Sequence, residues 1–446
     1  MNKIKKIIEF LLCLYIFILP WQTILIFKEN FIVDYKNQFG TLGLYFSEII
    51  LWLLIIFVII FFIKKIKTEG KINFFWSLDR KFIFSGFLFL SYSFLSIIWS
   101  FDKELAWQKS LQILEMFLFF LILLLNFVDY KKILKVLVWS SIFPGVLGIY
   151  GFLTQSFFAN KFLGLSFYDA SFSGPSIIAG DTIGRWLRNY GSFPHPNFFA
   201  GFLLVSFLAS CLLFKIEKNK IFIFLIMCLQ LMSLFFTFSR SAFLSLFFLL
   251  MFLLYFFRKD FKIFFRENKI YFLACFCLVG FLFLIFKPLI FTRLAGQTLA
   301  EQRSYSERSE LNFESIEIIK NNFLFGIGAG NYIFAVLKNN PEKMPFAYQP
   351  VHNIFLLFFA EFGLFGTVFF ISMLYFFSKF YLNFSEKKYN YVLIIFCLFL
   401  PIFLLDHYFY SFYSGMAYFS LICFIFFGLS SDNPLFFPRK AKNGLN

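Results

Sequence analysis

Apolar runs of roughly 18 to 25 residues recur along this 446-residue chain, and short clusters of lysine and arginine separate them. An α-helix of about 20 apolar residues is long enough to cross the ~30 Å hydrocarbon core of a bilayer. A helix also satisfies its own backbone hydrogen bonds, which lipid cannot do. The pattern therefore predicts an all-α polytopic membrane protein embedded in a lipid bilayer.

The composition supports this class. Hydrophobic residues make up 60% of the chain, charged residues only 15%, and 81 residues are phenylalanine, which excludes a soluble protein. The formal net charge of +16 could indicate a nucleic-acid partner. However, the basic residues lie in short clusters between the apolar runs, as the positive-inside rule describes, and do not form one patch. We therefore expect no nucleic-acid partner.

The basic clusters also give an orientation. They follow every second apolar run, so about twelve membrane-spanning helices with both chain ends in the cytoplasm account for all of them. Two further spans are expected on either side of Asp406. The first ten expected spans are approximately 7–19, 47–63, 82–99, 111–128, 136–153, 198–214, 221–236, 241–257, 270–291 and 352–378.

This topology divides the chain into three parts. Residues 1–190 hold helices one to five and an outer loop. Residues 191–378 hold helices six to ten, with a large, partly helical outer loop over 292–350 before helix ten. Residues 379–446 hold helices eleven and twelve and a basic cytoplasmic tail.

The chain has only three histidines, and the topology places all of them at the outer face. His195 stands between two prolines, and Asn197 after it is a good N-cap for helix six. A simple cap-and-turn role is the alternative for this segment. His352 and Asn353 stand where helix ten is expected to begin. Histidines in such positions suit proton transfer.

Two arginines at the outer face suit the binding of an anion. Arg240 lies between two apolar helices, where it must face a polar cavity, form a pair or extend to the membrane interface. Ser304-x-x-Glu307 resembles a capping box and predicts a helix that begins at Ser304. In that helix Arg308 shares a side with Leu311, which we expect to be the packed side.

A carboxylate also lies within an expected span. Glu361 is over two turns into helix ten, and an intramembrane carboxylate is a functional candidate by default. Its setting, Glu361-Phe-Gly363-Leu-Phe-Gly366, offers tight helix packing as an alternative. The outer carboxylates Asp169, Asp181 and Asp406 lack metal-ligand spacing, and the glycines at 326–330 lack the residues of a nucleotide loop. We therefore expect neither a metal nor another cofactor.

The order of these motifs resembles the O-antigen ligase/polymerase superfamily. The resemblance covers about residues 191–366 in motifs and the whole chain in topology. The matching segments are Ser-Phe-Pro-His-Pro-Asn-Phe-Phe-Ala (192–200), Thr-Phe-Ser-Arg-Ser-Ala (237–242), Arg308 followed by Gly326-Ile-Gly328-Ala-Gly330-Asn331-Tyr332, Val351-His352-Asn353, and Glu361-Phe-Gly363.

The resemblance implies a GT-C-like membrane glycosyltransferase in the bacterial cytoplasmic (inner) membrane. Such an enzyme transfers a glycan from an undecaprenyl-pyrophosphate carrier to a glycan or lipid-core acceptor on the extracytoplasmic side. It implies that His352 is catalytic and that Arg240 and Arg308 bind the donor pyrophosphate. We assign acceptor or supporting roles to His195, Asn197, Asn353 and Glu361.

Two other functions remain open at this point. A polymerase that joins lipid-linked repeat units needs the same donor site and differs only in its acceptor. A transporter of lipid-linked glycans needs polar residues through the whole membrane and gates at both faces. The polar candidates gather at one face, and only Glu361 stands out within the spans, so the sequence favours a transferase.

Overall fold

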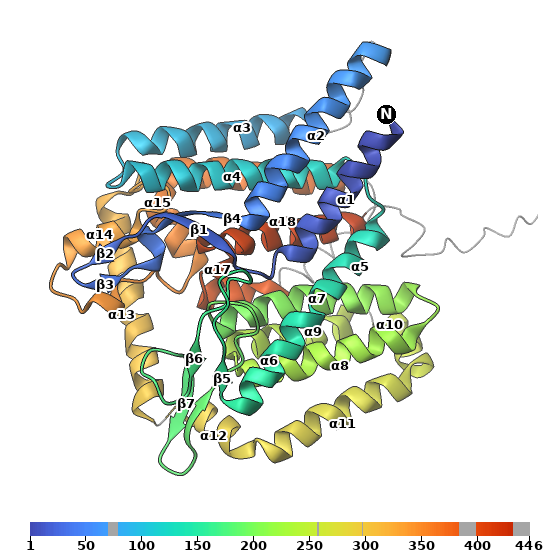
Figure 1. Cartoon of the computed structure of the whole chain (residues 1–446), viewed down its shortest axis with the longest axis vertical. Coiled ribbons are helices and arrows are strands. Elements are labelled where there is room, and N and C mark those ends of the chain that lie inside the picture. Colours follow the sequence, from blue (N-terminus) through green and yellow to red (C-terminus); the bar gives the residue numbers. More distant parts are fainter. Residues whose placement is uncertain (70–78, 257, 297, 383–397, 431–446) are drawn as a thin grey trace, which may run out of the picture.

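The computed structural model describes residues 1–69, 79–256, 258–296, 298–382 and 398–430. Most of these residues are helical, and the long helices run between two ends of the molecule (Figure 1). The helices are α1 (Asn2–Ile18), α2 (Phe46–Glu69), α3 (Arg80–Leu95), α4 (Lys103–Leu124), α5 (Tyr130–Ser140), α6 (Ile142–Thr154), α7 (Pro196–Ile216), α8 (Lys220–Thr237), α9 (Arg240–Phe256), α10 (Arg258–Glu267), α11 (Lys269–Ile285), α12 (Lys287–Ala295), α13 (Leu299–Asn321), α14 (Tyr332–Asn339), α15 (Ile354–Leu382), α17 (Tyr408–Ser411) and α18 (Tyr413–Ser430).

Strands are short and form four antiparallel pairs: β1 with β4, β2 with β3, β5 with β6, and β7 with β8. They all lie in the connections before α2 and between α6 and α7. Their bounds are β1 (Ile24–Lys28), β2 (Phe31–Ile32), β3 (Tyr35–Lys36), β4 (Leu42–Tyr45), β5 (Ser156–Phe157), β6 (Tyr168–Asp169), β7 (Ile177–Gly180) and β8 (Gly184–Leu187).

The structure is that of a multi-pass membrane protein. Among the described residues, seven helices are long and apolar enough to cross a bilayer, and α11 with α12, bent by 78°, makes an eighth. The expected count of twelve is not confirmed in this part of the chain. α1, Arg240–Met251 of α9 and Tyr413–Ile425 of α18 correspond to three further expected spans but are too short or not apolar enough to count. Of the expected helix eleven, only residues 398–405 are described, and these are helical.

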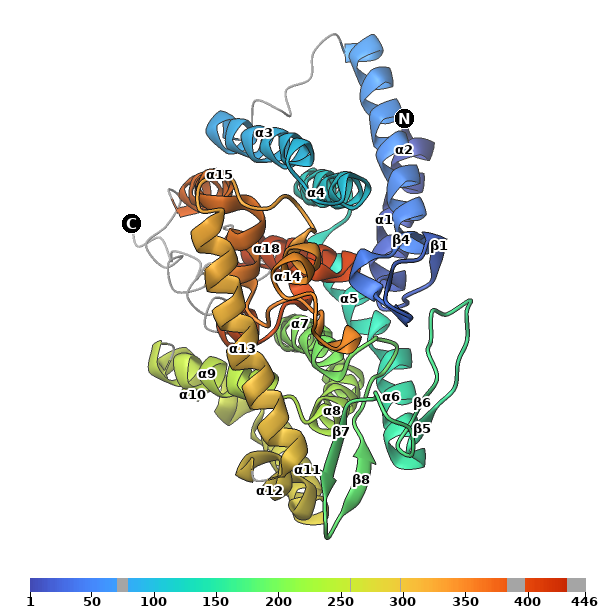
Figure 2. The same ribbon diagram turned by 90° about the vertical axis from the view of Figure 1, so that its left-hand side faces the viewer.

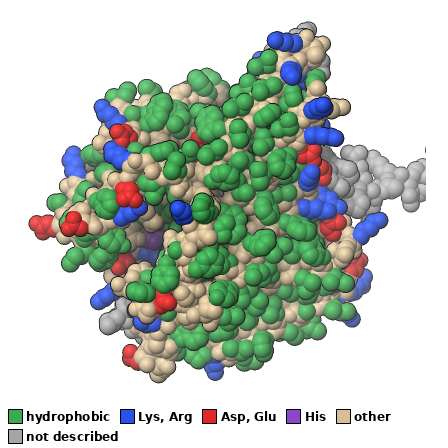
Figure 3. Space-filling view, in the orientation of Figure 1, with side chains coloured by type: hydrophobic (Ala, Val, Ile, Leu, Met, Phe, Trp, Pro, Cys, Tyr) green, Lys and Arg blue, Asp and Glu red, His purple; other side chains and the backbone are tan. Residues whose placement is uncertain are grey.

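Phenylalanine fills both the interior and the surface of the bundle. α15 packs along α3, α7 along α8, and α18 along α4. Phe119, Phe199 and Phe202 are fully buried in the core, whereas Phe276 and Phe281 of α11 stay exposed. Figure 3 shows a broad hydrophobic band with charged side chains gathered at its two ends. Such a band matches the acyl chains of a bilayer, which solvate apolar side chains.

One end of the bundle carries the strand pairs, α13 and α14, and we call it the loop end. Figure 2 views the molecule from this end and shows α13 crossing the ends of the other helices. α13 begins at Leu299, five residues before the helix start predicted from Ser304. The capping-box interpretation is therefore wrong, and Arg308 lies in the third turn of the helix. Leu311 is buried, as expected for the packed side.

The membrane-spanning helices hold more buried polar side chains than Glu361 alone. Lys109 Nζ in α4 donates to the carbonyl of Tyr410 at 2.5 Å. Glu115, six residues further along α4, accepts from the indole of Trp52 at 2.7 Å. These side chains bind protein groups, which reduces the cost of placing them in a membrane. The sequence did not indicate them, because Lys109 lies in a polar stretch before the expected span 111–128 and Glu115 stands alone in an apolar run.

Candidate functional site

All three histidines of the chain meet at the loop end. His195 precedes α7, His352 precedes α15 and His407 precedes α17. The ring centroids of His352 and His407 are 5.1 Å apart, with the rings nearly perpendicular. Tyr408 joins the third histidine to them, because its ring lies 4.4 Å from His407 and stacks at 5.1 Å on His195. Three segments distant in sequence thus contribute one imidazole each.

His195 caps α7. Its backbone is extended (φ −150°, ψ 140°), and its Nδ1 accepts the backbone N–H of Asn197 at 3.1 Å. Pro196 takes the first helical position, where a missing N–H costs nothing. The prediction that Asn197 itself is the N-cap is wrong, because its side chain is used elsewhere. The capping bond holds the imidazole of His195 in one orientation.

A buried polar network connects four segments beside the histidines. Arg188 donates to the carbonyl of Thr237 at 2.7 Å and to Asn197 Oδ1 at 2.5 Å. Asn197 Nδ2 in turn donates to Asp406 Oδ1 at 2.9 Å, and Ser241 Oγ donates to Asp406 Oδ2 at 2.7 Å. Both carboxylate oxygens of Asp406 are therefore held, and this fixes the position of the residue after it, His407.

His352 and His407 differ in their hydrogen bonds. His407 Nδ1 lies 2.8 Å from the hydroxyl oxygen of Ser411, one turn along α17. His352 Nδ1 is shut off from solvent, and no hydrogen-bond partner for it lies within the described part of the chain. A buried imidazole nitrogen without a partner is uncommon in a folded protein. It is placed to accept a proton or a hydrogen bond from a bound molecule.

Burial and positive charge keep these imidazoles neutral. Burial, and after it the charge of Arg308, lowers the pKa of His352 to about 3. Burial also holds the pKa of His195 and of His407 well below the usual value, with Arg188 adding to the effect at His195 and His352 adding to it at His407. At neutral pH all three rings are uncharged, so each has one nitrogen with a lone pair, which in His195 is the Nδ1 already bound to the N–H of Asn197.

Two of the predicted arginines approach the site from α13 and α9. Arg308 is half-buried, and its positive charge lowers the pKa of all three histidines. Arg240 stacks its guanidinium on the ring of Tyr305 at 4.5 Å and donates to the Tyr305 hydroxyl. Tyr305 stands one turn before Arg308 on α13. This helix therefore brings the two arginines to one region, although only Arg308 acts on the histidines directly.

Asn353 is the N-cap of α15. Its side-chain oxygen accepts the N–H groups of Phe355 and Leu356 at 2.9 and 3.2 Å. The helix consequently begins at Ile354 and not at His352 as predicted. His352 lies in a bend just before the helix, where its ring contacts that of His407.

Glu361 lies apart from the histidines. One of its carboxylate oxygens accepts the N–H of Gly330 at 2.6 Å and the hydroxyl of Tyr410. The ammonium of Lys109 donates to the carbonyl of the same tyrosine at 2.5 Å. Glu361 therefore ties a loop and α17 to α15.

α15 is broken directly after this carboxylate. Gly363 has φ 59° and ψ −165°, a conformation that only glycine adopts readily. The loop 323–330 enters the break and replaces the missing helical hydrogen bonds. The four backbone bonds are Ile327 N–H to Ala360 O (3.0 Å), Gly328 N–H to Glu361 O (2.9 Å), Leu364 N–H to Phe323 O (2.8 Å) and Phe365 N–H to Leu324 O (3.2 Å). The glycine-rich motif is thus a docking loop that fills a broken helix.

Replacing Gly363 by alanine should destabilise the protein. A Cβ at this position would meet the backbone nitrogen of Gly326 at 2.5 Å, and the backbone conformation alone costs about 1–3 kcal/mol for other residues. We expect the thermal unfolding midpoint in detergent to fall by several degrees. Gly280→Ala in α11 is the matched control, because nothing lies within 4 Å of its added Cβ. Equal midpoints for the two variants would contradict this account of the break.

Sequence reasoning left Arg188, Asp406 and His407 out of the candidate set. The signal for Asp406 and His407 was a polar pair between two apolar runs, at the same face as the other histidines. Arg188 has no local signal, since its role depends on Asn197 and on the end of α8. Among the described ranges, no three histidine, cysteine or acidic side chains stand close enough to hold a metal ion.

Comparison with known families agrees with the motifs. Residues 222–371 match the family model described as O-antigen ligase, so the resemblance to the O-antigen ligase superfamily is confirmed. The matched stretch includes Arg240, Arg308 and His352. It leaves out His195 and His407, which come from segments on either side of it. No curated protein matches the chain. The three-part division of the chain stays a prediction.

Proposed function

We propose that this protein is an integral membrane glycosyltransferase of the bacterial cytoplasmic membrane. It moves a glycan from an undecaprenyl-pyrophosphate carrier to an acceptor on the extracytoplasmic side. The observation that carries the proposal is that three neutral histidines and Arg308 lie close together at the loop end. His352 and both predicted arginines also fall within the stretch that matches the O-antigen ligase family model.

In the proposed reaction, His352 is the general base. The acceptor hydroxyl loses its proton to the imidazole as its oxygen attacks the anomeric carbon of the donor glycan. The bond from that carbon to the pyrophosphate oxygen breaks, and the electron pair leaves with undecaprenyl pyrophosphate. The unpartnered Nδ1 of His352 supports this role. A positioned histidine contributes about 10²- to 10⁴-fold to such a step.

Arg308 and Arg240 bind the pyrophosphate and stabilise its developing charge. Guanidinium groups bind phosphate oxygens in pairs and stay charged at every relevant pH, so they supply the positive charge that a divalent cation supplies in other transferases. The positive charge of Arg308 lowers the pKa of His352. The bound anion offsets this charge and so raises the pKa again. Donor binding therefore makes the imidazole a stronger base when the base is needed.

The orientation in the membrane is part of the proposal. Lysines and arginines of short loops concentrate on the cytoplasmic side of membrane proteins. Clusters such as Lys64–Lys65, Lys131–Lys132 and Lys218–Lys220 occupy the end opposite the loop end (Figure 1). This distribution supports placing the histidines at the extracytoplasmic face, where lipid-linked glycans are used.

Proteoliposomes that contain the purified protein and an undecaprenyl-pyrophosphate-linked glycan test the function. A polymerase should convert the donor alone into a ladder of longer lipid-linked glycans. A ligase should leave the donor unchanged until a lipid-core acceptor is added and should then label that acceptor. Movement of the intact donor across the bilayer without a new glycosidic bond would instead identify a transporter and overturn the proposal.

A further inference from the structure

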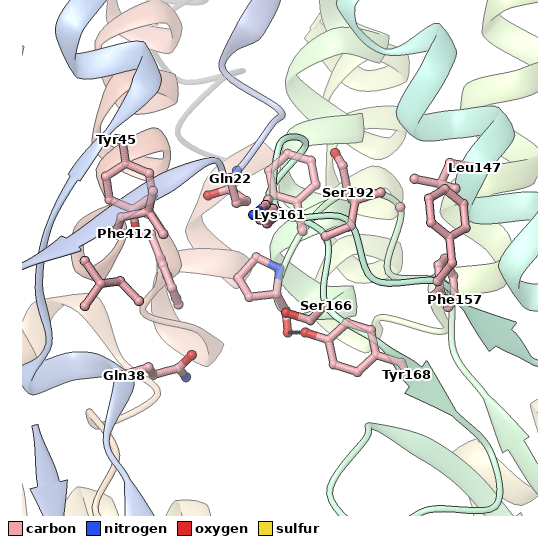
Figure 4. Close-up of a pocket in the computed structure, with 18 of the residues that line it drawn as sticks. Gln22, Gln38, Tyr45, Leu147, Phe157, Lys161, Ser166, Tyr168, Ser192 and Phe412 are labelled. Carbon is pink, nitrogen blue, oxygen red and sulfur yellow. Dashed lines mark hydrogen bonds between the residues drawn. The ribbon is translucent and has the colours of Figure 1, made fainter. Parts of the chain in front are cut away.

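A cavity of about 370 Å³ opens at the loop end beside the histidines. Its volume falls in the range of small-molecule sites, about 300–1,000 Å³. Figure 4 shows its two facing walls, with Gln38, Tyr45 and Phe412 on one side and Leu147, Phe157 and Tyr168 on the other. The first wall comes mainly from the strand pairs before α2, and the second from α6 and the connection that follows it.

The lining mixes aromatic rings with uncharged polar groups. The side-chain amide of Gln38 is exposed and forms no hydrogen bond with the described residues, so its NH₂ group and its oxygen are available to a ligand. The Tyr168 hydroxyl donates to the carbonyl of Pro194 at 3.3 Å and also interacts with the hydroxyl of Ser166, so two hydroxyl groups face the cavity together. Sugar hydroxyls both donate and accept hydrogen bonds, and the C–H faces of sugar rings pack on aromatic side chains. This combination of groups suits a saccharide.

A lysine gives the cavity a preference for negative charge. Lys161 is exposed at the lining, and its ammonium group forms no ion pair or hydrogen bond among the described residues but lies 5.3 Å from the centroid of the Phe162 ring. An ammonium group without an ion pair attracts a carboxylate or phosphate substituent. We therefore expect acidic sugars to bind better than neutral ones.

The cavity borders the reaction site without overlapping the donor arginines. Pro194 lines the cavity and directly precedes His195. Phe412 lines it too and packs on Phe39, which in turn contacts His407 at 5.5 Å. None of its lining residues falls within 222–371, the stretch that matches the family model. The parts outside the shared domain thus build a second site next to the shared one.

We propose that this cavity binds an acidic saccharide and presents it to the histidines as the sugar of the acceptor. The acceptor role rests on the proposed function, whereas saccharide binding does not. Donor chemistry would then come from residues shared across the family, and acceptor choice from the strand pairs and the 155–195 connection of this chain.

Saturation-transfer NMR on the full chain in nanodiscs tests the proposal. The probes are the disaccharide β-glucuronyl-N-acetylglucosamine and its neutral counterpart β-glucosyl-N-acetylglucosamine, which differ only at C6 of the first sugar. We expect both to receive saturation and the acidic one to bind about two- to fivefold more tightly, the size of an exposed ion pair. Lys161→Ala should remove this difference, and Lys103→Ala, an exposed lysine on α4 outside the cavity, should retain it.

Ser166→Trp should fill the cavity and abolish saturation of both disaccharides, and Gln38→Leu should weaken it if the tryptophan variant does not fold. Both variants should still bind the lipid-linked donor. Equal saturation in wild type and Ser166→Trp, or none in wild type, would overturn the proposal and leave the proposed function standing. If the disaccharides still receive saturation but the protein has no transferase activity, the cavity is a saccharide site but does not hold the acceptor.

Discussion

His352→Ala should lower turnover by at least about 100-fold while donor binding stays nearly normal. The variant removes the imidazole that takes the acceptor proton, and such a group contributes about 10²- to 10⁴-fold. It leaves Arg308, Arg240 and the network around Asp406 in place. Turnover in proteoliposomes and binding of the lipid-linked donor, measured on the same preparation, separate the two effects.

The chain offers no histidine outside the site as a control, so His352→Gln serves instead. Glutamine keeps hydrogen-bonding groups but has no basic nitrogen, and it should be as inactive as alanine. If His352→Ala keeps near-normal turnover and loses donor binding, the histidine is a pyrophosphate ligand and another group is the base. His407 would then be the next candidate, since its ring lies 5.1 Å away.

Arg308→Gln should weaken donor binding by about tenfold or more, because a hydrogen bond to a charged group contributes about 1.5–3 kcal/mol. Arg308→Lys should fall between wild type and glutamine, since lysine keeps the charge but loses the planar fork. Arg303→Gln, an exposed arginine on the same helix, is the matched control and should bind the donor normally.

Arg308→Gln should also change the pH dependence of kcat/KM. The active form of His352 is neutral, so kcat/KM falls as the pH drops through the pKa of the free site. A pKa of about 3 places that fall far below pH 6.5 in wild type. Arg308→Gln removes one cause of the low pKa, so the fall should move to higher pH, although burial keeps it below pH 6.5. An unchanged profile would mean that Arg308 does not act on the base.

Periodicity and length alone predicted most of the helices, because a helix long and apolar enough for a bilayer leaves few alternatives. The ends of helices were less predictable. Asn197 is a better N-cap by preference than His195, yet the cap is His195 because Asp406 and Arg188 require the Asn197 side chain. A tertiary contact decided between two residues that both suit the position.

The site was only partly predictable for a similar reason. His195, His352 and Arg308 carried motifs, whereas Arg188 and Asp406 matter through partners far away in sequence. The sequence offers tight helix packing as an alternative role for the segment around Gly363, whereas the structure has a break in α15 there. A glycine in an apolar run indicates close packing of helices unless another segment of the chain fills a break in the helix. The sequence does not show that residues 323–330 fill such a break in α15.

The filled break in α15 makes the chain unequally tolerant of changes in length. α13, which carries Arg308, is joined by the docking loop to the helix that follows His352, so one added residue between 322 and 330 would shift the arginine relative to the histidine. Residues 340–347, half of them exposed, connect segments that are already anchored on both sides, and their one ion pair to α13 is that of Lys343 with Glu314 among the described residues. Insertions there cost only a small increment of loop entropy. The spacing of arginine and base is therefore set by the docking loop, and the connection of similar length beside it tolerates changes in length better.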